Sequence, residues 1–318
     1  MSSDYISRLR AELLRAGAAE HAPRRRARAV RRLRPLAAAV AVALLVATAA
    51  LTLPSERRDE APAQDPSDVV TLTYRVQTGD ATQAAQIMRE RLNAAGITTE
   101  VTAGDSTLTI TAPDTARADV TTLTAPGRFA IYDWELSVLG PDGRPAPTDP
   151  AVTGGPDAGQ AAALTEAEAR SRAGKSPGAR ALQADRGWFA LGGDAALSNA
   201  DVASARADED SAGGGPSVAL ELTPPGQQAF TTLTRELAQR GADQAGSGDP
   251  LQTSQHLALV LDGRIVSTPF IDWQEAPDGI DGAGGAYMSG LSTPKQAWLT
   301  AALLSAEPLP GTLELVQG

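Results

Sequence analysis

The sequence contains no cysteine, and its only histidines are His21 and His256. Without cysteine the chain can form no disulfide bond, zinc–thiolate site or lipid-modified cysteine, and it offers no thiol nucleophile. The two histidines are expected in different parts of the protein, so neither a histidine pair nor a Ser–His–Asp arrangement is predicted. The sequence therefore predicts no catalytic residue, no metal site and no cofactor site, and a protein that is not an enzyme.

Aromatic residues are also scarce, at 4% of the chain, so the core is expected to consist mainly of Ala, Val, Leu and Ile. Charge is unevenly distributed along the chain. Residues 1–35 carry ten arginines and three acidic residues, a net charge of +7, whereas the remainder carries 18 basic and 35 acidic residues, a net charge of −17. Because nucleic-acid binding requires a positively charged surface, the acidic bulk argues against nucleic acid as a partner.

A long uncharged run occupies residues 35–53, immediately after a segment with seven arginines. The run is about as long as one bilayer crossing requires, and the arginines mark the cytoplasmic side by the positive-inside rule. We therefore predict a cytoplasmic basic segment at 1–34, a transmembrane helix at 35–53 and a proline-containing linker at 54–68. The predicted location is the cell membrane, crossed once, with the N-terminus in the cytoplasm and the bulk of the chain outside.

Two features of this region have a second interpretation. Residues 47–49 have the small–x–small form of a signal-peptidase site, but the long basic segment and the length of the run favour an uncleaved anchor. Residues 3–20 place Ile6, Leu9 and Leu13 at helical spacing. This short amphipathic helix is either a solvated cytosolic segment, which we favour, or a helix that binds a partner.

The folded part is expected to begin near Val69 with a strand, a helix and two further strands. Residues 69–76 alternate between apolar and polar as a strand does, and residues 97–102 and 106–111 are predicted to be the next two strands. Asp80 gives a helix start signal and Gly96 a helix stop. The residues predicted to be buried on the strand and the helix are the apolar ones at the matching period, Val70, Leu72, Tyr74, Val76, Ala84, Ile87, Met88, Leu92 and Ala95. This order is the first part of a ferredoxin-like βαββαβ unit.

Two later segments could complete that unit, because each contains a helix followed by a strand. One consists of residues 115–124 with 128–134, and the other of residues 293–306 with 312–316. The pattern of residues alone leaves both open.

Residues 140–215 give the weakest signals, since glycine- and proline-rich stretches surround one predicted helix at about 160–172 and one predicted buried strand at 187–191. Long loops of this kind are either functional or poorly ordered, and we favour the second. The carboxylates of Asp133 and Glu135 are interpreted as solvated surface groups, the default in a chain this acidic.

Clearer signals return after residue 216. Residues 217–222 alternate as a strand, Thr223 and Pro224 begin a helix, and Gly241 is predicted to end it. Residues 257–269 read as two strands joined by Asp262 and Gly263, the residue pair favoured in a type I′ turn. A last helix begins at a Thr293–Gln296 capping box, with Trp298 and Ala301 or Ala302 predicted to face inward.

The second half resembles SecD, a subunit of the bacterial protein-export machinery. The resemblance lies in five stretches in matching order, at residues 188–205, 218–234, 257–271, 286–297 and 303–316. It implies an α+β fold in which a ferredoxin-like base, at 69–134 and 292–318, contains an inserted α+β head. The head would begin within the glycine- and proline-rich insertion at 135–216 and continue through 217–291. The family motif residues, which form a structural hairpin and loop, are Leu261, Asp262, Gly263, Ile265, Ser267, Pro269, Ser289 and Gly290.

The chain departs from SecD because SecD continues into several membrane helices that carry proton-coupling carboxylates and pair with SecF. Here the chain ends at Gly318, and the predicted span at 35–53 contains no ionisable side chain. The expected function is that of a membrane-anchored, non-catalytic, SecD-like domain that binds exported polypeptide or translocase subunits. The alternative is a sensor whose helix at residues 3–20 binds a soluble cytosolic partner.

Overall fold

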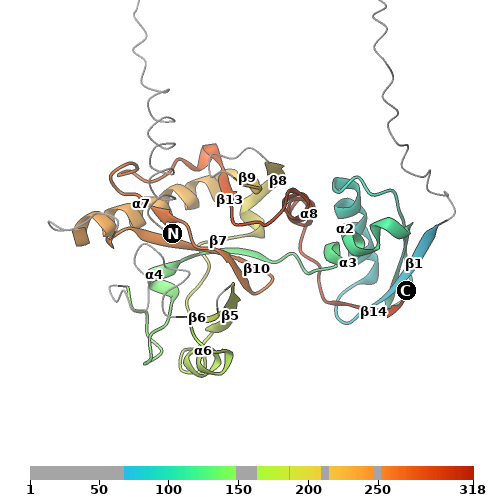
Figure 1. Cartoon of the computed structure of the whole chain (residues 1–318), viewed down its shortest axis with the longest axis horizontal. Helices are drawn as coiled ribbons and strands as arrows, with labels where there is room; N and C mark the ends of the chain where they lie inside the picture. Colours follow the sequence, from blue (N-terminus) through green and yellow to red (C-terminus); the bar gives the residue numbers. More distant parts are fainter. Residues whose placement is uncertain (1–67, 148–162, 186, 209–214, 246–251) are drawn as a thin grey trace, which may run out of the picture. The chain divides into compact units, whose positions relative to one another are not determined.

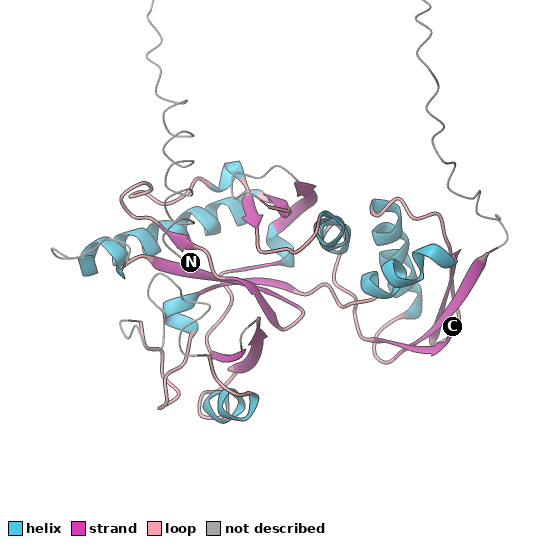
Figure 2. Ribbon diagram, in the orientation of Figure 1, coloured by secondary structure: helices cyan, strands magenta, loops and turns pink. Residues whose placement is uncertain are grey.

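The computed structural model describes residues 68–147, 163–185, 187–208, 215–245 and 252–318 (Figure 1). The predicted basic segment, transmembrane helix and amphipathic N-terminal helix lie outside these ranges, as does the linker up to residue 67. No helix in the part of the chain that the structure describes is both long and apolar enough to cross a membrane. Residues 68–318 form one compact unit of mixed α and β structure (Figure 2).

One sheet of this unit is small and antiparallel, and its strand order is β14-β1-β3-β2. It contains the first three strands of the unit and its last strand. Its elements are β1 (Val69–Val76), α2 (Ala81–Ala94), β2 (Glu100–Ala103), β3 (Thr107–Pro113), the 3₁₀ helix η1 (Asp114–Ala116), α3 (Arg117–Leu123) and β14 (Leu313–Gln317). All nine residues predicted to be buried on β1 and α2 are buried. The Asp80 side chain caps α2 by accepting from the backbone N–H of Thr82, and Gly96 has a φ of +57°, so both predicted helix boundaries are confirmed.

The strand that lies beside β1 at the sheet edge comes from the C-terminal end of the chain. β14 pairs antiparallel with β1, whereas β4 (Phe129–Asp133) pairs with β10 (Gln255–Leu261) in a different sheet. Of the two segments left open by the sequence, residues 312–316 therefore contribute the strand to the small sheet.

The remaining strands form a seven-stranded sheet, with the order β6-β5-β11-β10-β4-β7 and β12 also paired to β10, and a three-stranded sheet, β13-β9-β8. Their elements are α4 (Trp134–Ser137), α6 (Glu166–Ala173), β5 (Arg180–Ala184), β6 (Gly187–Leu191), β7 (Leu197–Ser198), η3 (Asn199–Asp201), β8 (Val202–Asp208), β9 (Ser217–Leu222), α7 (Pro224–Ala245), β11 (Arg264–Ser267), β12 (Phe270–Ile271), η5 (Gly282–Gly284), β13 (Ala286–Met288) and α8 (Pro294–Leu304). Apolar side chains of α7, β9 and β10 pack together between these sheets.

The predicted hairpin is confirmed at its turn. β10 and β11 pair antiparallel, and Asp262 and Gly263 have φ angles of +50° and +77°, the left-handed values that a type I′ turn requires. The hairpin occupies the middle of the seven-stranded sheet, with β4 on one side and β5 on the other.

The expectation that residues 140–215 are mostly irregular is wrong for the described part of that stretch, which contains α6 and the four strands β5 to β8. The predicted strand at 187–191 is confirmed as β6, and the predicted helix as α6, which begins at Glu166 after a Thr165–Glu168 capping box. Among the strands that the sequence missed, β7 has two residues and pairs with the distant β4, whereas β5 and β8 pair with the next strands along the chain, β6 and β9, and alternate only weakly between apolar and polar residues.

The prediction that Gly241 ends a helix is wrong, because α7 continues through it to Ala245. Gly241 is buried beneath the loop that precedes β10. A Cβ atom added there would lie 2.8 Å from Cδ1 of Trp273 and 3.0 Å from the carbonyl oxygen of Thr253. Glycine is therefore required here for a close approach between chain segments, not for a turn.

The prediction that Trp298 faces inward is also wrong, because its side chain is 37% exposed while Ala297, Ala301 and Ala302 are buried. α8 contributes to two cores at once. Leu299, Ala302 and Leu303 lie in the first core, the apolar cluster around the small sheet, and Ala297, Ala301 and Leu304 lie in the second core, the cluster around α7. Helix faces buried on two sides leave only a narrow solvent-facing stripe, and Trp298 lies on it.

Replacing Gly241 by alanine is expected to destabilise the protein although alanine favours helix. The added methyl group overlaps Trp273 and Thr253, and overpacking of this kind costs about 1–3 kcal/mol, more than the gain of about 1 kcal/mol in helix propensity. Urea unfolding of the full chain measures the difference, with Gln239→Ala on the exposed side of α7 as control. A variant at least as stable as the parent would contradict this interpretation of Gly241.

Candidate functional site

A cleft of about 650 Å³ lies between α3, α8 and the β10–β11 hairpin. Its volume is within the range of ligand-binding sites in proteins. The apolar residues that line it are Ala118, Ala125, Leu261, Val266, Leu299 and Leu303. The cleft thus joins three segments that are far apart in the sequence, including the predicted hairpin and the predicted last helix.

Charged side chains also line the cleft, and two of them, Lys295 and Arg264, form ion pairs. Lys295 on α8 forms an ion pair with Asp119 on α3, with 2.7 Å between Nζ and Oδ1. Arg264 at the start of β11 forms another with Asp185, at 2.6 Å. The cleft therefore combines apolar lining residues, which can bind apolar side chains, with charged lining residues that are paired within the protein.

Asp262 fixes the hairpin turn against the connection between α3 and β4. Its carboxylate accepts hydrogen bonds from the backbone N–H groups of Gly127, at 3.1 Å, and Arg128, at 2.8 Å. The backbone N–H of Asp262 donates in turn to the carbonyl of Arg128. One wall of the cleft is thereby held at a defined position by hydrogen bonds to a charged group, which are stronger than neutral ones.

Beneath the same connection lies Arg91, whose side chain is fully buried. Its guanidinium donates to the carbonyl oxygens of Leu123, Ala125, Pro126 and Glu307, at 2.5 to 3.1 Å. Burial lowers the pKa of Arg91 to about 10, while the nearby charge of Asp262 acts in the opposite direction. The group stays charged at neutral pH, and the four carbonyls compensate for part of its lost hydration, since its buried Nε has no hydrogen-bond partner in the described part of the chain.

The sequence interpretation did not single out Arg91. A signal was present, since Arg91 lies three residues after Met88 and four after Ile87, on the buried stripe of α2. A charged residue on the buried face of a predicted helix indicates either that the predicted face is wrong or that the charge has hydrogen-bond partners inside the protein.

The eight family motif residues do not form a single cluster. Leu261 and Asp262 line the cleft, Gly263 completes the turn, and Ile265 is buried in a third core with Tyr132 and Phe189. Ser267 pairs with Leu259 across the hairpin, and the carbonyl of Pro269 accepts from the N–H of Leu257.

The two remaining motif residues, Ser289 and Gly290, are exposed in the loop before α8. A Cβ atom on Gly290 would lie 3.3 Å from the carbonyl oxygen of Val266. The structure thus brings this loop next to the second strand of the hairpin.

A second polar group lies inside the larger sheet, and it overturns the interpretation of Asp133 and Glu135 as solvated. Glu135 is 2% exposed and His256 1% exposed, with 2.6 Å between Oε1 and Nδ1. The other carboxylate oxygen of Glu135 accepts from the backbone N–H of His256. Asp133 accepts two hydrogen bonds from Arg240 on α7, which also donates to Gln255. The sequence analysis named no partner for His256, since Glu135 is 121 positions away.

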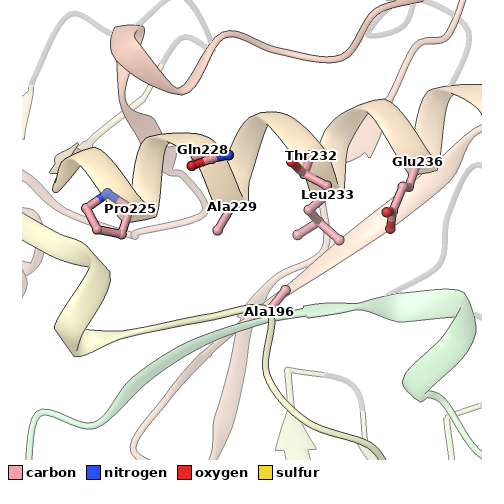
Figure 3. A pocket seen from close by; sticks show the side chains of 7 residues that line it. All are labelled: Ala196, Pro225, Gln228, Ala229, Thr232, Leu233 and Glu236. Atoms are coloured by element: carbon pink, nitrogen blue, oxygen red, sulfur yellow. The ribbon is translucent and has the colours of Figure 1, made fainter.

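A second groove, of about 480 Å³, lies between α7 and the segment before β7 (Figure 3). Figure 3 shows Ala229 and Leu233 of the helix pointing toward Ala196, which precedes β7, and Gln228 and Thr232 on the same helix also line the groove. Its lining carries one charged residue, Glu236. Across the described ranges no group of three or more Asp, Glu or His side chains is arranged to hold a metal ion.

These features define a mixed α+β domain with a cleft of mixed apolar and charged lining between α3, α8 and the β10–β11 hairpin. Residues 178–311 match the family model of the SecDF P1 head subdomain. This part of the chain is therefore similar to the head of the first extracytoplasmic domain of SecDF, in agreement with the resemblance to SecD seen in the sequence.

Two solved structures are similar over 78% of this chain. A crystal structure of SecDF in a super-membrane-facing form has 20% sequence identity and a TM-score of 0.49, and the chain spans 29% of that SecDF chain. A structure from a study of SecDF as a membrane component that enhances protein export has 20% identity and a TM-score of 0.48, with 99% of that chain covered. No curated protein matches the chain.

Replacing Glu135 by alanine is expected to destabilise the protein by about 3 kcal/mol, because His256 would lose the partner of both its ring and its backbone N–H inside the core. The matched control is Glu166→Ala, which removes an exposed ion pair with Arg170 and is expected to cost under about 0.5 kcal/mol. Urea unfolding of the full chain gives both values. Equal decreases in the free energy of unfolding for the two variants would show that the buried pair stabilises the protein no more than the exposed pair does.

Proposed function

We propose that this protein is a membrane-anchored, non-catalytic domain that binds extended polypeptide outside the cytoplasm, in the cleft between α3, α8 and the hairpin. The observation that carries the proposal is the cleft itself, whose lining includes the apolar residues Leu261, Val266 and Leu299 and charged residues that are paired within the protein. SecDF, a membrane component, enhances protein export. A polypeptide in transit is extended and exposes apolar side chains, which apolar lining residues can bury.

The contacts in the cleft support a binding role over a catalytic one. Asp119 is paired with Lys295, and the carboxylate of Asp262 is occupied by two backbone N–H groups. No histidine lines the cleft. General acid–base catalysis requires a group within reach of substrate that can exchange a proton, and these carboxylates are already engaged in structural contacts.

Three structural assignments belong to this proposal. The small sheet, with its antiparallel order β14-β1-β3-β2, is the ferredoxin-like base, and the segment between β3 and α8 contains the inserted head. We assign residues 35–53, which lie outside the described ranges, as a membrane span and residues 68–318 to the extracytoplasmic side, on the basis of the arginine-flanked apolar sequence. Translocase subunits are a second class of partner, since a polypeptide presented here must come from or pass to a membrane channel.

Filling the cleft is expected to weaken polypeptide binding at least tenfold. Thr122 is an exposed residue of α3 that lines the cleft, so Thr122→Trp places a large ring in it. The probe is a carboxymethylated, permanently unfolded polypeptide with a fluorescent label, and its affinity for the full chain is measured by anisotropy. Thr121→Trp, at the neighbouring exposed position outside the cleft, is the control.

Two results would contradict the proposal. One is that the parent protein does not bind the unfolded polypeptide at micromolar concentration. The other is that Thr122→Trp and Thr121→Trp bind it equally well, which would place the binding surface elsewhere.

A further inference from the structure

The groove between α7 and the segment before β7 belongs to the second core alone, since both elements contribute side chains to that core (Figure 3). Leu233, which is 6% exposed, lies at its base. The residues beside it, Ala229 and Ala196, have small side chains that leave the space above Leu233 open. The groove therefore offers an apolar surface that the fold of this one region creates.

One side of the groove coincides with the end of the seven-stranded sheet. β7 pairs with β4 and is the last strand in that direction, so no other strand of the described ranges lies beyond it. Extended polypeptides are commonly bound at sheet ends of this kind, where one edge of the last strand is unpaired. An extended chain can therefore reach the groove from the open side of the sheet.

The length of the groove sets the size of the segment that fits it. Its lining residues on α7 run from Pro225 to Glu236. At 1.5 Å per helical residue this is about 16 Å, a length that an extended chain covers with about five residues. Since successive side chains of an extended chain point to opposite faces, two or three of these five would contact the groove. Small or medium apolar side chains suit the space above Leu233.

The charge of the groove indicates a further property of its ligand. Glu236 is exposed, and it has no hydrogen-bond or ion-pair partner among the described residues. Arg240, four residues further along α7, is at the spacing that allows a helical ion pair. Its guanidinium is instead bound to Asp133 and Gln255. The carboxylate of Glu236 is thus available to a cation supplied by a ligand.

We propose that this groove binds a short extended segment of polypeptide in which apolar side chains lie next to a lysine or arginine, with the cation paired to Glu236. The acidic composition of the chain after residue 35 favours the approach of such segments at longer range. The inference rests on the proposed function, because it takes polypeptide as the ligand. It adds a second site, separate from the cleft between α3, α8 and the hairpin, and a preference for positive charge.

The charge preference is tested with two labelled peptides, Val-Ala-Val-Ala-Lys and the same peptide with N-acetyllysine, which has no charge. The full chain is expected to bind the lysine peptide about threefold more tightly in anisotropy measurements at low salt, the size of effect that an exposed ion pair produces. In Glu236→Gln the two affinities are expected to become equal.

The control for Glu236→Gln is Asp243→Asn, which removes one negative charge from the same helix two turns further on. This variant is expected to keep the preference for the lysine peptide. Equal affinities of the two peptides for the parent protein would overturn the proposal, and so would a preference that persists in Glu236→Gln.

The location of the site is tested by filling the groove. Ala196 is exposed, so Ala196→Trp places a large ring in the groove without adding volume to the core. The lysine peptide is expected to bind at least fivefold more weakly, whereas Ala94→Trp, at an exposed position of α2, leaves its affinity unchanged. Unchanged affinity in Ala196→Trp would overturn the assignment. Should that variant not fold, Glu236→Gln, which alters one exposed group, decides the question.

The groove and the cleft can fail separately. A parent protein that binds the unfolded polypeptide but shows no preference for the lysine peptide contradicts the groove and leaves the proposed function in place. Binding of the unfolded polypeptide that is lost in Ala196→Trp and retained in Thr122→Trp supports the groove and contradicts the cleft.

Discussion

The double burial of α8 is the constraint on which the arrangement of this protein depends. Leu299 and Leu303 complete the core of the small sheet, and Ala301 and Leu304 complete the core around α7. Because β14 follows this helix and pairs with β1 at the start of the folded unit, the small sheet cannot be completed until the chain has passed through the larger one. The last helix and strand, α8 and β14, therefore pack against elements from the beginning of the folded unit.

Buried charge is placed where segments distant in sequence meet. Arg91 donates to the carbonyls of Pro126 and Glu307, Glu135 binds His256, and Arg240 binds Asp133. Removing one partner of such a group is costly, whereas an alternative arrangement of the chain would have to satisfy all of them again. These contacts thus specify how the strands and connections are assembled, while apolar burial provides most of the free energy of folding.

Features with a local cause could be predicted from the sequence. The alternation of β1, the cap and stripe of α2, and the positive φ angles at Asp262 and Gly263 follow from residues within a few positions of each other. Features with a distant cause could not. Gly241 was assigned to a helix end because its neighbour Trp273 is far along the chain, and β5 joins the sheet through a single parallel pair between Gln183 and Arg264.

The same distinction applies to the candidate site. The motif residues Leu261 and Asp262 were identified from sequence, but the cleft that they line also requires Thr122 of α3 and Leu299 of α8, which only the fold brings together. Glu135 and Asp133 were taken for surface groups because nothing near them in sequence indicates His256 or Arg240 as partners. An acidic composition favours interpreting any carboxylate as a solvated surface group. Here the tertiary contacts show instead that these two carboxylates are paired inside the protein.

Native-state hydrogen exchange of the full chain tests the central claim most directly, namely that α8 makes the two cores one cooperative unit. The amides to compare are those of β1 in the small sheet and β10 in the large sheet. If the claim is correct, their slowest amides open with the same free energy and the same dependence on denaturant, because neither core persists without the other. Two groups of amides with different opening free energies, one for each sheet, would contradict it.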